Sequence, residues 1–447
     1  MNKKHKKKTE NFMKLLKYLL LVVAASTFVS PAVYAECDES GDVTHYEKEL
    51  DERDWSALYD YINTKRTINV QEKACNLTIS GDVRSEWRHM RENLAGRVVR
   101  VNGGELPSRN DIDIEFNLRF DYVHDRAWAV AHLDFDNSAG NWNDRKCIET
   151  IDGIDVSYRE DIHGSGVGCD ISLKKAYMGY NVCCDGCTRF DIELGRRNLF
   201  NVFDSEVQFL SRFDGILFKY SSCSECLGDW YVNAAGFVVD YRSNHYAWIV
   251  EAGLLNLLDT GFDVKYSFIE WKKHGENVCG VKNPKGAQFE VSQFTVAYHL
   301  DPEFLCMPAK AFGAVLFNSA ASPLGITSAT DFIHSQNDNL GWYAGLQIGE
   351  VVYEGDWAVK AQYQYVQALA VPDFDVSGIG SGNALGYSIP GNGVGNTNYK
   401  GWRIEGLYAL TDNITIDTRI QWSRQIKSSY VGTHHYSEYR IQAIYAF

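Results

Sequence analysis

Histidine and carboxylate clusters are the first candidates for chemistry in this sequence. The stretch 434–438, His-His-Tyr-Ser-Glu, resembles an inverted zinc-protease motif, in which two histidines and a glutamate would hold a metal and its water. The stretch falls at the start of an expected strand, however, so no helix turns these ligands toward one point. Asp111 and Asp113 could form an acid–base carboxylate pair, but they alternate with apolar residues as the wet face of a strand does. The sequence therefore predicts no enzyme, no cofactor and no metal.

The eleven cysteines offer a second kind of chemistry. Cys184 and Cys187, and likewise Cys223 and Cys226, have the two-residue spacing of zinc ribbons and thioredoxin-like motifs. Both pairs fall in expected hairpin turns, and the long separation between them favours disulfides over a shared metal. An Asp-Gly turn would place Cys184 opposite Cys187 at about 5.5 Å between Cα atoms, which is within bridging range. The cysteines expected to form disulfides are Cys147, Cys169, Cys183, Cys184, Cys187, Cys223 and Cys226.

A two-residue period, typical of β-strands, runs along the chain from residue 77 to its last residue. In the stretch 111–122, for example, Ile112 and Ile114 begin an apolar face, whereas Asp113 and Glu115 belong to a polar one. We expect sixteen strands, to within two, and they begin near Leu77, Ile112, Ala127, Ser172, Arg189, Phe213, Asp229, Tyr246, Phe262, Phe289, Lys310, Gly341, Asp356, Tyr399, Ile414 and Ser437. A half-exposed soluble sheet has the same alternation, so the strand count and the residues at the strand ends must decide the fold.

Short turns and long polar connections alternate between the expected strands. Seven short turns would lie at one end and eight longer loops at the other, as in an outer-membrane barrel with both termini in the periplasm. Aromatic residues at the ends of the apolar faces are typical of the belts that such barrels place at the membrane surfaces. The predicted fold is all-β, a transmembrane antiparallel β-barrel of about sixteen strands, which is wide enough for an aqueous channel.

The N-terminal residues carry a different pattern. Seven lysines surround or precede the apolar run 18–29, and Val33-Tyr34-Ala35 offers small residues for cleavage, so residues 1–35 are predicted to be a secretory signal peptide. Cleavage would remove the seven lysines and one glutamate, and would take the formal net charge from −14 to −20. Residues 36–74 would form a periplasmic segment with helical spacing between 46 and 64, and residues 75–447 would form the barrel. Such an acidic exported chain can form disulfides, and it does not suit nucleic acid.

The loop from Gly195 to Asp214 is the third long loop and resembles the third loop of general porins, and this resemblance implies that it folds into the barrel and narrows it. Asp204 and Glu206 lie on this loop, and an acidic edge that faces arginines would create a transverse field that sorts charged solutes. The arginines expected at the constriction are Arg84, Arg88 and Arg119 on the first strands, and Arg196, Arg197 and Arg212 at the roots of the loop. Because this local field would outweigh charge on remote loops, we expect a weak anion preference. The alternative is that all these charges are simply solvated in a wide lumen.

The signal peptide, the Cys-rich barrel, the flanks 195–197 (Gly-Arg-Arg) and 213–215 (Phe-Asp-Gly) of this loop, and the final Phe447 resemble the Pom-type porins of chlamydia-related, amoeba-dwelling bacteria. The last strand, with Tyr439, Tyr445 and Phe447, also resembles the signal by which outer-membrane barrels are recognised for insertion. The first resemblance implies a cysteine-crosslinked outer membrane in which porins serve general solute uptake. The same loop flanks are also similar to those of alginate-export and other substrate-specific channels.

The sequence therefore predicts a Gram-negative outer-membrane porin, a passive diffusion channel for small hydrophilic solutes and ions. Its expected partners are outer-membrane lipid, these solutes, further copies of the chain in a homotrimer, and disulfide-linked periplasmic or sibling proteins. Two alternatives remain open. One is a channel specific for a sugar or a polyanion, and the other is a structural or adhesive, disulfide-crosslinked surface protein.

Overall fold

The computed structural model describes residues 68–69, 76–94, 97–98, 108–139, 145–151, 154–160, 170–224, 228–240, 245–273, 277–278, 281–282, 289–300, 307–321, 338–372, 375–379, 397–427 and 434–447. The chain divides into two compact units, residues 1–48 and 49–447, and every described residue belongs to the second. The predicted signal peptide (1–35) and the predicted helical stretch (46–64) lie outside the described residues, and residues 68–69 are the described part of the predicted segment 36–74. Within the described ranges, no helix has the length and apolar character of a transmembrane helix.

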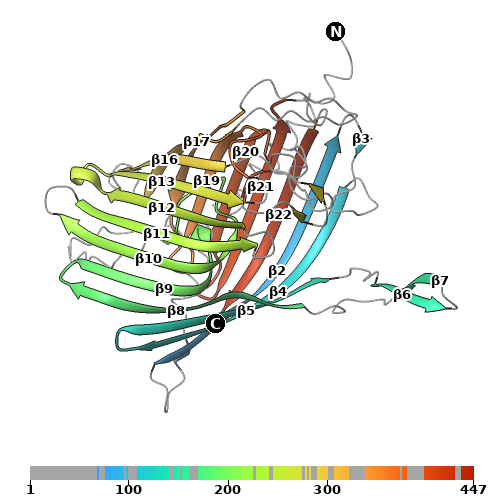
Figure 1. Ribbon diagram of the computed structural model, residues 1–447, viewed down its shortest axis with the longest axis horizontal. Coiled ribbons are helices and arrows are strands. Elements are labelled where there is room, and N and C mark those ends of the chain that lie inside the picture. The colour runs from blue at the N-terminus through green and yellow to red at the C-terminus, as the bar shows by residue number, and fades with distance from the viewer. Residues whose placement is uncertain are drawn as a thin grey trace, which may run out of the picture. The chain divides into compact units, whose positions relative to one another are not determined.

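Sixteen long strands form one closed antiparallel barrel (Figure 1). Each strand pairs with the next one along the chain, and β22 returns to pair with β2. The strands are β2 (Leu77–Leu94), β4 (Ser108–His124), β5 (Ala127–Ala139), β8 (Asp170–Asp185), β9 (Thr188–Asn198), β10 (Arg212–Ser224), β11 (Gly228–Asp240), β12 (His245–Leu255), β13 (Phe262–Lys273), β16 (Phe289–Leu300), β17 (Ala309–Asn318), β18 (Leu340–Gly349), β19 (Trp357–Val366), β20 (Tyr399–Ala409), β21 (Ile414–Gln425) and β22 (His434–Ala446). The predicted fold class is confirmed, and each predicted strand begins within four residues of the observed one.

Shorter elements accompany the barrel. They are β1 (Ile68–Asn69) and β3 (Arg97–Val98), which both pair with β2, the hairpins β6 (Arg145–Ile151) with β7 (Ile154–Glu160) and β14 (Asn277–Val278) with β15 (Val281–Lys282), and the 3-10 turns η3 (Leu199–Asn201) and η5 (Leu257–Asp259). Of these, only η3 takes part in the site described below.

Connections of two kinds alternate along the barrel, as predicted. The connections at one end, here called the turn end, consist of residues 125–126, 186–187, 225–227, 256–261, 301–308, 350–356 and 410–413. Those at the other end, here called the loop end, consist of residues 95–107, 140–169, 199–211, 241–244, 274–288, 319–339, 367–398 and 426–433.

The outer face of the barrel is apolar, although it is the face that the fold leaves exposed. Large hydrophobic side chains alternate outward along the strands, and they include Val83, Ile112, Leu194, Phe294 and Ile441, each at least 40% exposed. Exposed aromatic side chains form two belts on this face. The belt near the turn end consists of Tyr122, Tyr180, Phe262, Tyr298, Trp357, Tyr408 and Tyr445, and the belt near the loop end consists of Trp87, Tyr246, Trp248, Phe317, Trp402, Trp422 and Tyr439. An apolar band between two aromatic belts is the surface that a barrel presents to lipid.

The inner face of the barrel is polar, except for an apolar cluster near the loop end that includes Phe213 and Ile249. Buried side chains that alternate inward are hydroxyl, amide and charged groups, among them Ser80, Asp82, Asn117, Asp134, Asp191, Asn233, Asp263, Ser267, Gln362 and Gln442. A soluble barrel has the opposite arrangement, because its apolar residues leave water for the interior. The alternation predicted from the sequence is therefore present, with its apolar face turned outward.

The seam between β2 and β22 closes the barrel (Figure 1). The N–H of Phe447 donates to the carbonyl oxygen of Gly81 at 3.0 Å, and the N–H of Gly81 donates to the carbonyl oxygen of Phe447 at 3.1 Å. The Phe447 ring covers Gly81 and stacks on Phe116, with 6.1 Å between ring centroids. A Cβ at position 81 would lie 2.6 Å from Cζ of that ring, so the close approach at the seam requires glycine.

Candidate functional site

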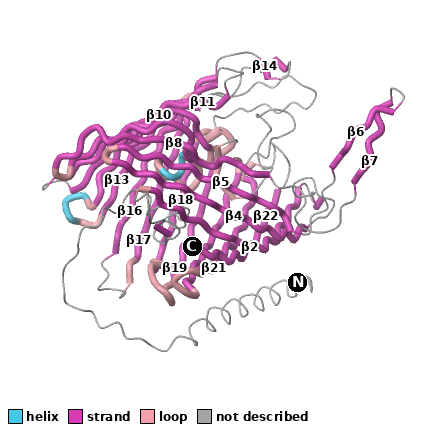
Figure 2. The backbone as a smooth tube through the Cα atoms, turned by 90° about the horizontal axis from the view of Figure 1, so that it is seen from below, coloured by secondary structure: helices cyan, strands magenta, loops and turns pink. Residues whose placement is uncertain are grey.

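The candidate site is the interior of the barrel, where the loop 199–211 folds inward from the end of β9. After the 3-10 turn η3 (cyan in Figure 2), Phe203, Val207 and Phe209 are at most 1% exposed. They pack in one hydrophobic cluster with inner-face residues near the loop end of the strands, such as Phe213 of β10 and Ile249 of β12. Burial of these side chains inside the barrel holds the loop across the lumen, which is the position predicted for it.

Glu206 fastens the loop to β19. Its carboxylate forms an ion pair with Lys360 and accepts a hydrogen bond of 2.8 Å from the side-chain amide of Gln362. Gln364 donates to the backbone carbonyl oxygen of Glu206 at 3.2 Å. The Lys360 side chain is 2% exposed and that of Glu206 is 11% exposed, so this ion pair is largely removed from water.

The neighbouring residues of the loop contact three other strands. Asp204 forms an ion pair with Lys265 of β13, and its backbone N–H donates to Glu251 of β12 at 3.1 Å. The hydroxyl of Ser205 donates to the side-chain oxygen of Gln293 of β16 at 2.8 Å. The loop therefore follows the inner wall across consecutive strands, and each strand supplies one polar anchor.

These anchors were not among the residues predicted from the sequence. Lys265, Lys360, Glu251 and Gln293 are each at most 3% exposed and lie on inner faces whose loop-end positions are apolar. The sequence did contain a signal for them: on each of these strands, a charged or amide residue shares the inward face with apolar residues. Asp204 and Glu206 thus face lysines on the wall behind the loop, whereas the sequence placed arginines opposite them.

Arg84, Arg88 and Arg119 lie on the inner face, as expected, and each has an acidic partner on its own strand. Arg84 pairs with Asp82, Arg88 with Glu86 at 2.9 Å and Arg119 with Asp121 at 2.7 Å. Further ion pairs lie within one strand, in Arg189–Asp191 and Arg197–Glu193 of β9, or join two strands, in Lys174–Glu115, Arg419–Glu405 and Arg440–Asp417. We call these eight pairs the paired wall. A wall of paired charges has short-range local fields that largely cancel at a distance.

Two of the arginines assigned to the loop roots lie elsewhere. Arg196 lies on the same face of β9 as Leu194, which is 49% exposed on the outer face, and it forms an ion pair of 2.7 Å with Asp214. Arg212 shares that face with Asp214 on β10. Both therefore lie outside the lumen, which differs from the predicted placement because the loop leaves the wall only at residue 199. Arg197 points inward, with its guanidinium carbon 4.4 Å from the centroid of the Tyr177 ring.

A second segment, within residues 367–379 in the connection between β19 and β20, joins the loop inside the barrel. In its described parts, Leu369, Val371, Val376 and Ile379 are at most 1% exposed and belong to the same hydrophobic cluster as the loop 199–211. The hydroxyl of Ser377 donates to the backbone carbonyl oxygen of Glu206 at 3.0 Å. The neighbouring Gly- and Asn-rich stretch 378–395 was predicted to be a loop without a functional role, so this contact was not expected.

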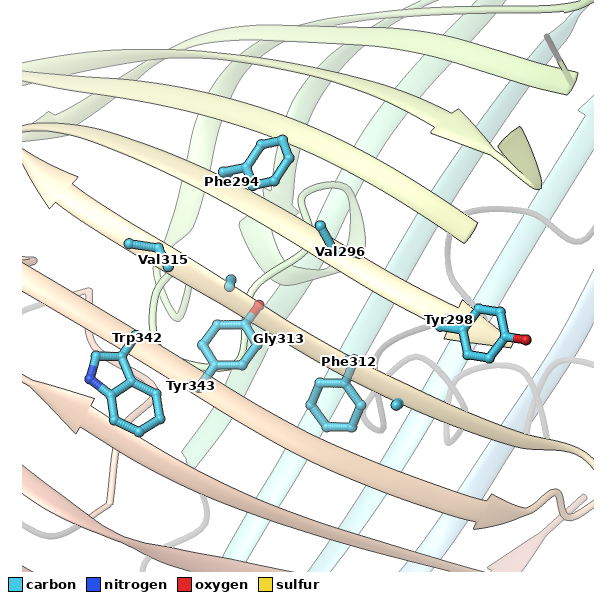
Figure 3. Close-up of a pocket in the computed structure, with 10 residues that line it drawn as sticks. Phe294, Val296, Tyr298, Phe312, Gly313, Val315, Trp342 and Tyr343 are labelled. Atoms are coloured by element: carbon cyan, nitrogen blue, oxygen red, sulfur yellow. The ribbon is translucent and has the colours of Figure 1, made fainter. Parts of the chain in front are cut away.

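A groove of about 490 Å³ lies on β16, β17 and β18 (Figure 3). Phe294, Tyr298 and Trp342, which belong to the outer face, line it, and Gly313 provides the space between them. Because its lining is almost entirely apolar and belongs to the lipid-like surface, we do not assign solute binding to it.

The described cysteines cluster at the turn end. Cys187 and Cys223 form a disulfide between two neighbouring turns, with 5.7 Å between their Cα atoms, whereas Cys183 and Cys184 are exposed and outside any disulfide in the described residues. The predicted Cys184–Cys187 bridge is therefore wrong. The register pairs Asp185 with Thr188, so the turn is centred one residue later than an Asp-Gly turn would be. The side chains of Cys147, Cys169 and Cys226 lie outside the described residues.

The residues of the expected insertion signal lie at the seam strand. Tyr439 and Tyr445 are exposed on the outer face of β22, one in each aromatic belt, and Phe447 packs over Gly81 as described above. In the described residues, no group of three or more His, Cys, Asp or Glu side chains is arranged to hold a metal ion.

Comparison with known proteins gives one family match and several structural likenesses. Residues 310–437, from β17 into β22, match the family described as "Putative porin". No curated protein matches the sequence. A high-pH structure of Pseudomonas putida OprB has 9% identity and a TM-score of 0.47, and the match covers 83% of this chain and 94% of that one. For Salmonella typhi OmpF in complex with daunomycin, the identity is 11% and the TM-score 0.45, with 85% and 100% covered. Over its last six strands, the chain is similar to porins.

Proposed function

We propose that the protein is an outer-membrane porin, a passive diffusion channel for small hydrophilic solutes and ions. The observation that carries this proposal is the inverted polarity of the closed barrel, which is apolar outside and polar within. Buried polar groups without water or partners would be costly, whereas a water-filled lumen hydrates them. The family match over residues 310–437 supports the same function, and the location it implies is the outer membrane of a Gram-negative bacterium.

Planar bilayers test this function directly. We expect purified, folded protein to produce discrete conductance steps, and the same preparation, denatured by heat, to produce none. Insertion of folded barrels without any step at any voltage would refute the channel. Liposome swelling with sugars of graded size would then define the size limit of the solutes, and a strong preference for one sugar would favour a substrate-specific channel.

We infer that ion selectivity is weak. Each described arginine of the paired wall has an acidic partner, and Asp204 and Glu206 have lysine partners. The anion preference expected from the sequence required unpaired arginines at the constriction, and two of its six arginines lie on the outer face. Local neutrality at the narrow zone favours the passage of neutral polar solutes and of ions of both signs.

The finer assignments are also proposals. We propose that the protein forms homotrimers. The resemblance to Pom-type porins of chlamydia-related bacteria supports disulfide-linked complexes in the envelope. Cys183 and Cys184, exposed at the turn end, are the described thiols suited to such links. We propose that residues 1–35 direct export and are removed, that residues 36–74 precede the barrel in the periplasm, and that the turn end faces the periplasm.

Gels of whole envelopes test the disulfide-linked complexes. With thiols blocked during preparation, we expect high-mass species that collapse to monomer on reduction, and we expect Cys183→Ser with Cys184→Ser to remove them without loss of conductance. Equal mobility with and without reductant would leave the crosslinked alternative without support.

A further inference from the structure

We propose that residues 375–379 form a second element of the pore constriction and that Asp375 is the residue that positions the tip of the loop 199–211. The proposal rests on the channel function proposed above. It concerns a segment that follows that loop in the sequence and is separated from it by eight barrel strands, β10 to β19.

The side chain of Asp375 holds the backbone of the loop tip. One carboxylate oxygen accepts the N–H of Phe209 at 3.0 Å, and the other accepts the N–H of Ser211 at 2.9 Å. Between them, the N–H of Leu210 donates to the backbone carbonyl oxygen of Asp375 at 3.1 Å. Three consecutive N–H groups of the loop therefore end on one residue, which leaves none of them unsatisfied.

The loop tip needs such a partner because its backbone turns sharply there. Phe209 has a φ of +74°, a left-handed conformation that a bulky residue rarely adopts unless the surroundings impose it. The turn prevents these N–H groups from joining a strand ladder. Asp375 is fully buried, and none of the contacts described for its carboxylate is to a basic side chain. The site therefore keeps a costly buried carboxylate for its hydrogen bonds to this backbone.

The segment after Asp375 is itself fixed to the wall. Arg403 of β20 donates to the carbonyl oxygen of Ser377 at 3.0 Å, and the hydroxyl of Ser423 of β21 donates to that of Ile379 at 3.1 Å. The loop 199–211 follows the wall from β10 to β19, and residues 375–379 continue the same inner layer to β20 and β21. The two together restrict the open path to the side of the paired wall.

Substitution of Asp375 tests this role. Asp375→Ala removes both side-chain acceptors, whereas Asp375→Asn keeps one oxygen and places an N–H donor against the other N–H. We expect both variants to increase the single-channel conductance and the open-channel current noise, with the larger increase for alanine. A spin label at Leu210→Cys, whose native side chain is 50% exposed, should lose its immobilised component in both.

Asp356 provides a matched control. Its carboxylate also accepts two backbone N–H groups, those of Val352 at 3.0 Å and Tyr353 at 2.7 Å, but it does so at the turn end. Asp356→Asn should leave the conductance, the noise and the label unchanged. Wild-type values for all three measurements in Asp375→Asn would overturn the proposal, and this variant decides the matter if Asp375→Ala does not fold. If no form conducts, the channel function fails, while the label still tests the positioning role.

Discussion

Replacement of Lys360 by methionine is the sharpest test of how the loop 199–211 is held. Methionine keeps the length and apolar stem of the side chain and removes the charge, so the carboxylate of Glu206 would retain only its hydrogen bond from Gln362. Breaking a buried ion pair by removing one partner costs about 3–5 kcal/mol, because the remaining charge stays buried. A single hydrogen bond to a charged group contributes less, about 1.5–3 kcal/mol. The carboxylate should therefore leave the wall and carry residue 206 into the lumen.

The exposed fractions of the Asp204 and Glu206 side chains predict which lysine partner matters more for holding the loop. The Asp204 side chain is 22% exposed against 11% for Glu206, so Asp204 can regain water almost in place when Lys265 is removed. We expect Lys360→Met to change the single-channel conductance and raise its noise, and Lys265→Met to do so less. In both variants, the barrel itself should keep its resistance to unfolding in detergent, since the strand ladders do not involve these side chains.

A double variant supplies the control. Well-packed apolar residues often replace a buried ion pair without loss of stability, so Lys360→Met with Glu206→Leu should restore quiet, wild-type-like steps. Noise and conductance of Lys360→Met that equal those of the wild type would refute the account of the anchor. A double variant noisier than either single variant would show that Glu206 acts through something other than Lys360.

Three further predictions concern selectivity, pH and the disulfide. In a salt gradient, the reversal potential should lie close to zero. A strong anion preference would mean that the ion pairs of the paired wall are broken in the conducting state. Burial raises the pKa of Asp375 from 3.8 to about 6, so docking of the loop tip is fully favoured below pH 3.8 and loses that contribution as the pH rises through 6. Current noise should therefore increase between pH 5 and about 7, and Asp375→Asn should abolish this increase, which an unchanged slope in that variant would contradict. Cys187→Ser removes a bridge across 36 residues, for which chain entropy gives about 3–4 kcal/mol, and should lower the unfolding temperature without altering conductance. An unaltered unfolding temperature would show that the neighbouring turns hold the barrel equally well without it.

The strands could be predicted from the sequence because their periodicity is local. In a lipid-facing barrel, the residues of each apolar face are every second residue of a strand, so the face is visible in the sequence. Ile112, Ile114 and Phe116 all lie on the outer face, as this alternation requires. The inward fold of the loop 199–211 was predicted by resemblance to the third loop of general porins, and not from a periodic pattern.

The partners of the charges could not be predicted in the same way. Whether Glu206 faces Arg84 or Lys360 depends on which strand lies behind the loop, and 154 residues separate Glu206 from the lysine that it contacts. The contact of Asp375 with Phe209 spans 166 residues and has no periodic signal. The disulfide was mispredicted for a smaller reason, a turn centred one residue later than its Asp-Gly sequence suggests.

The seam between β2 and β22 has a consequence for biogenesis. Asp82 pairs with Ala446, so the last ladder to form joins residues 364 positions apart in the chain. Until it forms, β2 and each newly added strand are sheet edges with unpaired N–H and C=O groups, which hydrocarbon does not tolerate and which other chains can capture. Contacts of such long range also form slowly. A half-made barrel of this kind cannot enter a bilayer strand by strand on its own, and its chain must be shielded from aggregation until both edges can meet.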